Sequence, residues 1–123
     1  MRKFILIALT VLAGVARADW VKVGETDEGR FFIDPVKVLN DGTVRQVWEL
    51  LDLNRRDEGG EMSRRIHVAY DCPRGRTKVL SLSTYWEPMA AGEKLFLVER
   101  EGLWKEVPPE TAYAAAFQLV CAP

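Results

Sequence analysis

The sequence has few of the residues from which most catalytic and metal sites are built. Its 123 residues include one histidine, His67, and two cysteines, Cys72 and Cys121. A zinc site needs clustered histidine and cysteine ligands, so we predict neither a metal nor a cofactor. A hydrolase triad can be drawn from His67 with Ser63 or Ser81, but the sequence has no Gly-x-Ser-x-Gly motif. His67 also falls on the polar side of a predicted strand, so we predict a surface histidine and no enzyme.

Long apolar stretches are absent after residue 18. Before it, two basic residues precede the apolar stretch 4–16, and small residues stand at positions 16 and 18. This layout is typical of a secretory signal, and the stretch is shorter than the roughly 20 residues that cross a bilayer. A retained anchor or a buried helix is the alternative. We predict that residues 1–18 are a cleaved signal peptide and that residues 19–123 form one domain without a membrane span.

The predicted mature chain also lacks an excess of positive charge. It holds 14 basic residues against 18 acidic ones, a formal charge of −4. Nucleic-acid phosphates require a basic surface, so we expect no nucleic-acid partner. The signal layout predicts an exported protein, either periplasmic or secreted to the medium or cell surface. No cysteine follows the predicted cleavage site, so we expect no lipid anchor.

Alternating apolar and polar residues predict a centre made of strands. The predicted strands cover residues 20–23, 31–33, 44–53, 61–72, 79–86 and 94–99, separated by turn residues. Within 44–53, the apolar residues Val44, Trp48 and Leu50 share one face, interrupted by Gln46; within 79–86, even-numbered residues share one face and odd-numbered residues the other. Short loops without intervening helices predict an antiparallel meander that is covered on one face.

The period changes after the proline pair at residues 108–109. Apolar residues then recur at helical spacing: Tyr113, Ala116, Phe117, Val120 and Cys121. Pro109 and Glu110 suit the first turn of a helix. The predicted fold class is therefore α+β, a single antiparallel sheet with a C-terminal helix packed on one face.

The two cysteines are predicted to join that helix to the sheet. Cys72 shares a strand face with Ile66, Val68 and Tyr70, and Cys121 lies on the apolar stripe of the helix. In an exported chain, an even number of cysteines predicts disulfides; free thiols or a redox pair are the alternative, although a redox pair is usually Cys-x-x-Cys. A bridge closing a loop of about 50 residues stabilises a fold by roughly 4 kcal/mol.

Basic residues gather at two places in the predicted sheet. Arg55 and Arg56 lie in one loop, and Arg74, Arg76 and Lys78 follow Cys72 at the opposite sheet end. Two interpretations are open: charged edges that prevent strands from pairing with other molecules, or contacts with an anionic partner such as a sulfated glycan or an acidic protein patch. The four tryptophans are expected mostly in the core.

Several short motifs occur in an order that resembles a known family. They are FFIDP, VWELLDL, YDC, YWEPMAAG, WKEVPP and a terminal VC, and the resemblance as a whole covers residues 20–121. The sequence resembles surface-adhesin protein E-like domains. The resemblance implies a six-stranded antiparallel sheet whose C-terminal helix is tethered by a disulfide, with Cys72 and Cys121 as the bonded pair.

The resemblance also implies a function. It predicts an exported, non-enzymatic binding domain that mediates adhesion to host extracellular-matrix or serum proteins. The alternative is a periplasmic accessory or structural protein that binds another component of the cell envelope. Both interpretations imply a protein partner, and two free sheet edges add a homodimer as a further expectation.

Overall fold

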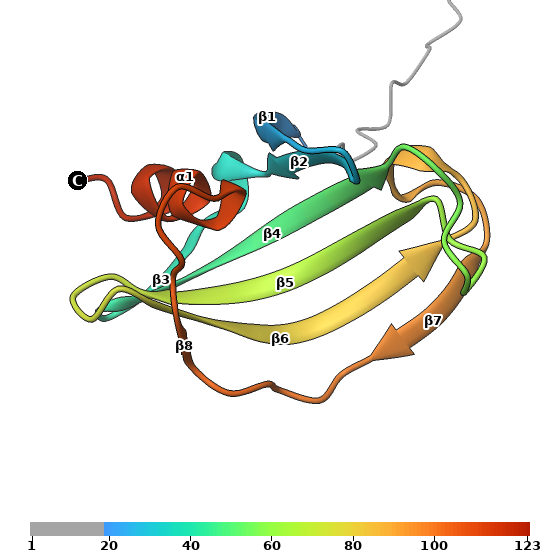
Figure 1. The fold of residues 1–123 in the computed structure, drawn as a ribbon. Coiled ribbons are helices and arrows are strands. Elements are labelled where there is room, and N and C mark those ends of the chain that lie inside the picture. The colour runs from blue at the N-terminus through green and yellow to red at the C-terminus, as the bar shows by residue number, and fades with distance from the viewer. Residues whose placement is uncertain (1–18) are drawn as a thin grey trace, which may run out of the picture.

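A computed structural model describes residues 19–123 as an open antiparallel sheet with one C-terminal helix (Figure 1). The predicted signal peptide, residues 1–18, lies outside the described residues. Six strands follow one another across the sheet in the order β1-β2-β4-β5-β6-β7, and two short strands pair beside this path, β3 with β4 and β8 with β6. The predicted meander of six antiparallel strands is confirmed, and the two short strands are additional to it.

The elements have the following bounds. The sheet consists of β1 (Val21–Glu25), β2 (Gly29–Ile33), β3 (Leu39–Asp41), β4 (Val44–Leu53), β5 (Ser63–Asp71), β6 (Arg76–Tyr85), β7 (Lys94–Val98) and β8 (Lys105–Glu106). The helix α1 spans Ala112–Val120, and two short 3-10 turns are η1 (Pro35–Lys37) and η2 (Pro88–Ala90).

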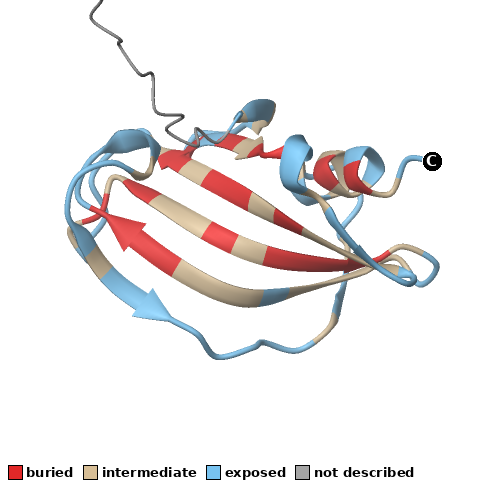
Figure 2. Cartoon of the chain, turned by 180° about the vertical axis from the view of Figure 1, so that it is seen from behind, coloured by how far each residue is buried: buried red, intermediate tan, exposed pale blue. Residues whose placement is uncertain are grey.

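The core lies between α1 and one face of the sheet. Ala116 and Val120 of α1 are buried, as the helical stripe predicts, against apolar side chains of β2, β4 and β5. These strands carry most of the buried positions in Figure 2. The buried apolar strand residues of this cluster are Phe31, Ile33, Val47, Ile66, Val68 and Tyr70.

The face of β4 that the alternation marks as apolar lies away from the helix. Val47 is directly opposite Val68 in the sheet register and packs in the core, so Trp48 and Leu50 point to the other face. Leu50 is nevertheless fully buried because η2 folds over that face. The expectation of one apolar and one polar side is therefore wrong for β4, since both of its faces are partly covered.

A β-bulge changes the faces of β6. Ser81 pairs with His67 but Val79 pairs with Val68, which leaves Leu80 as an extra residue. Val79 and Leu82 consequently share the helix-bearing face, and the prediction of strict alternation along 79–86 is wrong at this point.

The helix begins later than the sequence predicts. Thr111 is the N-cap: its Oγ1 accepts a hydrogen bond from the Ala114 amide at 3.2 Å. Pro109 and Glu110 precede the helix, and Glu110 has a φ of +59°. Placing Glu110 in the first helical turn was therefore wrong, although the helix itself is confirmed.

The predicted disulfide is present. Cys72 and Cys121 are bonded with their Cα atoms 5.6 Å apart, which joins the end of β5 to the end of α1. Arg45 of β4 adds a second tether, because its guanidinium donates to the Val120 carbonyl at 2.6 Å and to the Ala122 carbonyl at 2.8 Å. The last turn of the helix is thus fixed to two strands.

Helix α1 covers only part of the face on which it lies. Tyr113 packs edge-on against Phe31 of β2, and Phe117 packs edge-on against Tyr70 of β5. A helix is about 10 Å across, whereas six strands at about 4.8 Å spacing span roughly 24 Å. The β6–β7 side of the same face therefore lies beyond the helix, as Figure 1 shows.

Candidate functional site

The five predicted basic contacts fall into two groups at opposite ends of the sheet. Arg55 and Arg56 lie in the β4–β5 loop, while Arg74, Arg76 and Lys78 lie at and after the β5–β6 turn. Strand β5, of nine residues, separates the ends by roughly 30 Å. The structure does not bring the five residues together into one surface.

Most of these cations have partners within the chain. Arg56 lies 3.8 Å from the centroid of the Trp86 ring and donates to the Trp86 carbonyl at 2.7 Å. At the other end, Arg74 and Arg76 contact the carboxylate of Asp71 at 3.2 and 3.6 Å. Lys78 contacts Glu101 at 3.4 Å and also lies 4.7 Å from the centroid of the Trp104 ring. Their contact with an anionic partner stays a prediction.

A hollow beside Arg55 and Arg56 has mixed charge. Its volume is about 370 Å³, and its charged lining residues are Asp27, Glu28, Arg55, Arg56, Asp57 and Arg64. Arg64 makes an ion pair with Asp57 there. Because carboxylates stand among the guanidinium groups, this end of the sheet offers weak preference for an anion.

The tryptophans lie nearer the surface than expected. Trp86 is exposed, and Trp20, Trp48 and Trp104 are half-buried. The expectation that most of them lie in the core was wrong. Three of the four instead stack with cations, which keep their polar ends in water while covering the ring.

His67 and Ser63, which could be combined into a hydrolase triad on sequence grounds, have other partners in the structure. His67 stacks on Trp48 with ring centroids 4.3 Å apart, and burial together with the nearby Arg65 charge lowers the pKa of His67. The Ser63 hydroxyl is buried, donates to the Glu87 carbonyl at 2.7 Å and accepts from the Ala90 amide at 2.8 Å. Ser63 therefore holds the η2 segment in place.

An apolar pocket opens where the helix stops covering the sheet. The strap, residues 99–108, runs from β7 along β6 to the helix, and a pocket of about 470 Å³ lies between it, the sheet and α1. Ile66 and Val68 of β5 and Val79 of β6 are among the sheet residues that line it, while Leu103 and Tyr113 contribute from the strap and helix. None of these residues was predicted as a site residue, because the pocket joins segments far apart in the chain.

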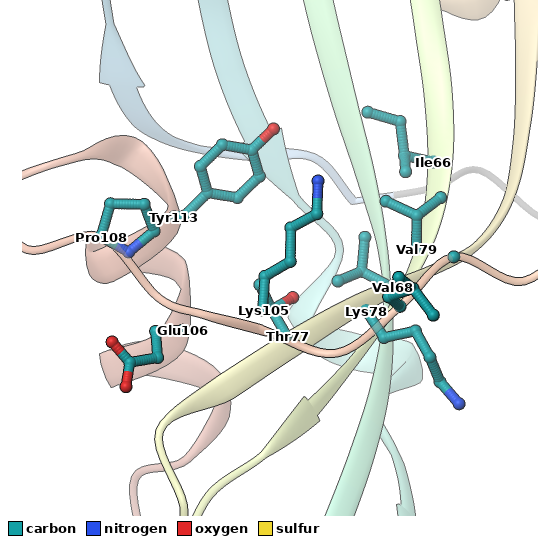
Figure 3. Close-up of a pocket in the computed structure, with 11 residues that line it drawn as sticks. Ile66, Val68, Thr77, Lys78, Val79, Lys105, Glu106, Pro108 and Tyr113 are labelled. Atoms are coloured by element: carbon teal, nitrogen blue, oxygen red, sulfur yellow. The ribbon is translucent and has the colours of Figure 1, made fainter.

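Figure 3 shows how the polar groups of this pocket point. The Lys105 side chain extends across the pocket toward the Tyr113 ring, whereas the Lys78 ammonium and the Glu106 carboxylate point away. Burial, followed by the Glu49 and Glu28 charges, raises the pKa of Tyr113. Tyr113 therefore presents a neutral hydroxyl beside a cationic ammonium.

The apolar surface continues from the pocket onto the edge strand. By the sheet register, Phe96 and Val98 of β7 share the helix-bearing face with Leu82 and Val79 of β6. Phe96 is 65% exposed and Leu103 is 81% exposed. We call the exposed apolar side chains of this region the apolar face: Val79, Phe96, Val98, Leu103 and Tyr113. The four apolar residues in a row at 95–98 were a signal for it.

Residues 19–123 show neither a clustered metal site nor a membrane-spanning helix. Within this range, no three or more side chains of His, Cys, Asp or Glu come together as a candidate metal site. No helix in the same range has the length and apolar character needed to cross a membrane.

Comparisons with known proteins agree with the fold. The family described as surface-adhesin protein E matches residues 20–122. The selenomethionine form of Haemophilus influenzae protein E superposes with a TM-score of 0.69 at 15% identity, covering 86% of this chain and 88% of that one. A second crystal form of that protein superposes with a TM-score of 0.63 at 15% identity, covering 83% of this chain and 96% of that one. No curated protein sequence matches this chain.

Proposed function

The chain belongs to the surface-adhesin protein E family, and from this premise we propose that it is an exported, non-enzymatic domain that binds a protein partner. We further propose adhesion to host extracellular-matrix or serum proteins as its role. Family membership implies an exported or cell-surface protein. Matched structures at 15% identity support the fold and leave the partner to be identified by experiment.

The observation that carries the proposal is the apolar face. Phe96 and Leu103 are large apolar side chains that are mostly in water; Phe96 lies on the edge strand β7 and Leu103 lines the pocket. Contiguous exposed apolar surface on a soluble domain marks an interaction site, because burying it in a complex is favourable by roughly 25 cal/mol per Å². The partner is therefore expected to bring an apolar surface to this side.

The basic groups are proposed as secondary contacts. Arg55 and Arg56 lie at one sheet end, and Arg74, Arg76 and Lys78 at the other. Charges at the rim of an interface mainly raise the rate of association and contribute less to affinity. We therefore expect that neutralising these residues reduces the salt dependence of the association rate more than it reduces the affinity.

Binding to immobilised basement-membrane extract and to immobilised serum proteins tests the function. The exported, oxidised protein should bind saturably, and Phe96→Glu with Leu103→Glu should weaken binding by about tenfold or more. The matched control is Val36→Glu, because Val36 is also apolar and 70% exposed but lies in η1, outside the apolar face. Equal binding by both variants would contradict the proposed surface.

Protease added to intact cells separates adhesion from the alternative. An adhesin is degraded from outside, whereas a periplasmic accessory or structural protein that binds another envelope component is protected and co-purifies with that component. Protection, together with a failure to bind either immobilised preparation, would replace adhesion by the alternative.

A further inference from the structure

We propose that the pocket between the strap and α1 binds a free amphipathic carboxylate, a single aliphatic chain ending in an anionic group. This goes beyond the proposed protein binding, because a small molecule in the pocket needs no contact with the exposed edge strand. The pocket volume of about 470 Å³ falls within the usual range of small-molecule sites.

The strap holds the pocket open because backbone hydrogen bonds fix it along β6 and to the turn before β6. The Gly102 amide donates to the Val79 carbonyl at 2.8 Å, and the Val107 amide donates to the Gly75 carbonyl at 3.0 Å. Between these bonds, β8 pairs Lys105 and Glu106 with the start of β6. The strap therefore cannot collapse onto the sheet without breaking backbone hydrogen bonds.

The walls of the pocket favour an aliphatic body. Ile66, Val68 and Val79 line it from the sheet, and Leu103 and Pro108 line it from the strap. Ile66 and Val68 are buried against the core, so the floor is fixed. Each methylene that leaves water for such a surface favours binding, whereas a polar body would lose hydrogen bonds to water there.

Lys105 supplies the preference for a negative end. Its ammonium extends across the pocket toward Tyr113, as Figure 3 shows, and it forms no ion pair with a carboxylate among residues 19–123. The other lysine of the lining, Lys78, is engaged by Glu101 at 3.4 Å and points away. A carboxylate placed between Lys105 and the Tyr113 hydroxyl would accept hydrogen bonds from both.

Calorimetry with laurate, used as a monomer below its micelle concentration, tests the proposal on the exported, oxidised protein. We expect one saturable site for laurate and weaker binding of dodecyltrimethylammonium, which has the same chain and the opposite charge. Lys105→Met should weaken laurate binding about tenfold and leave the binding of uncharged dodecanol nearly unchanged. The matched control is Lys37→Met, an exposed lysine in η1 outside the pocket, which should bind laurate like the wild type.

A second variant fills the pocket without removing the charge. Val79→Trp enlarges a partly exposed pocket residue and should weaken laurate and dodecanol alike. Thermal unfolding of each variant confirms that it is folded before binding is measured.

Laurate binding that is unaffected by Lys105→Met and Val79→Trp overturns the proposal, as does equal binding of the cationic probe. Binding to phosphatidylglycerol vesicles without binding to monomeric laurate overturns it too, by identifying a membrane surface as the partner. None of these results bears on the proposed adhesion through Phe96.

Discussion

Glu49 is a fully buried carboxyl in the middle of the core. It lies on the helix-bearing face of β4, where the Tyr70 hydroxyl donates a hydrogen bond to its Oε2. Among residues 19–123, its Oε1 has no hydrogen-bond partner. Burial raises the pKa of Glu49 to about 8, against the opposing effect of the Tyr70 hydrogen bond. At neutral pH the folded chain therefore keeps this group mostly protonated.

The raised pKa predicts that stability falls with rising pH. A glutamate in an unfolded chain has a pKa of about 4.3. Between about pH 4.5 and 8 the unfolded chain therefore releases a proton that the folded chain retains. The free energy of unfolding should fall across this interval by a few kcal/mol and level off above pH 8. Glutamine does not titrate, so the free energy of unfolding of Glu49→Gln, measured with urea, should increase relative to that of the wild type as pH rises.

The control for this comparison is Glu99→Gln, an exposed carboxyl in the strap. Its unfolding free energy should follow the wild-type pH profile within error. If Glu49→Gln and the wild type keep a constant difference from pH 4.5 to 8.5, Glu49 does not carry the pH dependence.

Single residues were predictable where chemistry alone determines the partner. Cys72 and Cys121 could be paired because no third cysteine competes. The expectation that most tryptophans lie in the core was wrong, because hydrophobicity does not show that Arg56 and Lys78 will stack on the rings of Trp86 and Trp104. Such contacts depend on the sheet register, which places loop and strand residues together across long separations.

At the scale of elements, the start of α1 depends on one hydroxyl. Thr111 accepts from the Ala114 amide and donates to the Pro108 carbonyl at 2.7 Å, which also fixes the end of the strap. Thr111→Ala should lower the free energy of unfolding by about 1 kcal/mol, and Thr111→Ser should restore most of it. Urea unfolding at a fixed pH measures both. Equal stability of the alanine and serine variants would show that the cap contributes nothing.

The spacing of apolar residues predicted which segments are helix and which are strand, but it did not predict which face of each strand meets the helix. The helical stripe of 113–121 was correct because one period persists over two turns. Strand β4 has apolar residues on both faces, so alternation could not tell which face meets the helix. The bulge at Leu80 inserts one residue without a sequence signal and moves Val79 to the pocket side. Strict alternation would have placed Val79 on the opposite face of the sheet, away from the pocket.

The whole molecule combines an open sheet with a cover that is too small for it. The helix shields β2, β4 and β5, and the strap crosses the uncovered side without filling it. Sequence patterns predict that a helix covers the sheet, because the stripe and the strand faces are local. How much of the face remains open depends on the width of the sheet relative to the helix. The apolar face and the pocket arise from this mismatch, so they could not be read from any one segment.

The disulfide decides whether the cover stays in place. A nine-residue helix is unstable alone in water, so α1 depends on its packing and on its tether at Cys121. Replacing both cysteines by alanine removes a crosslink over 49 residues and should cost about 4 kcal/mol, a large part of a typical total of 5–15 kcal/mol.

The loss should appear first at the helix. Hydrogen exchange of the Cys72→Ala, Cys121→Ala variant should show the α1 amides losing more protection than those of the central strands β4 and β5, because each of these strands is hydrogen-bonded to strands on both sides. Arg45→Met in the oxidised chain is the matched comparison, since it removes the hydrogen bonds to Val120 and Ala122 but leaves the crosslink. Its helix should stay better protected than that of the cysteine variant. If helix and strands instead lose protection equally in the cysteine variant, the crosslink stabilises the fold as one cooperative unit, and the helix is not a separately tethered cover.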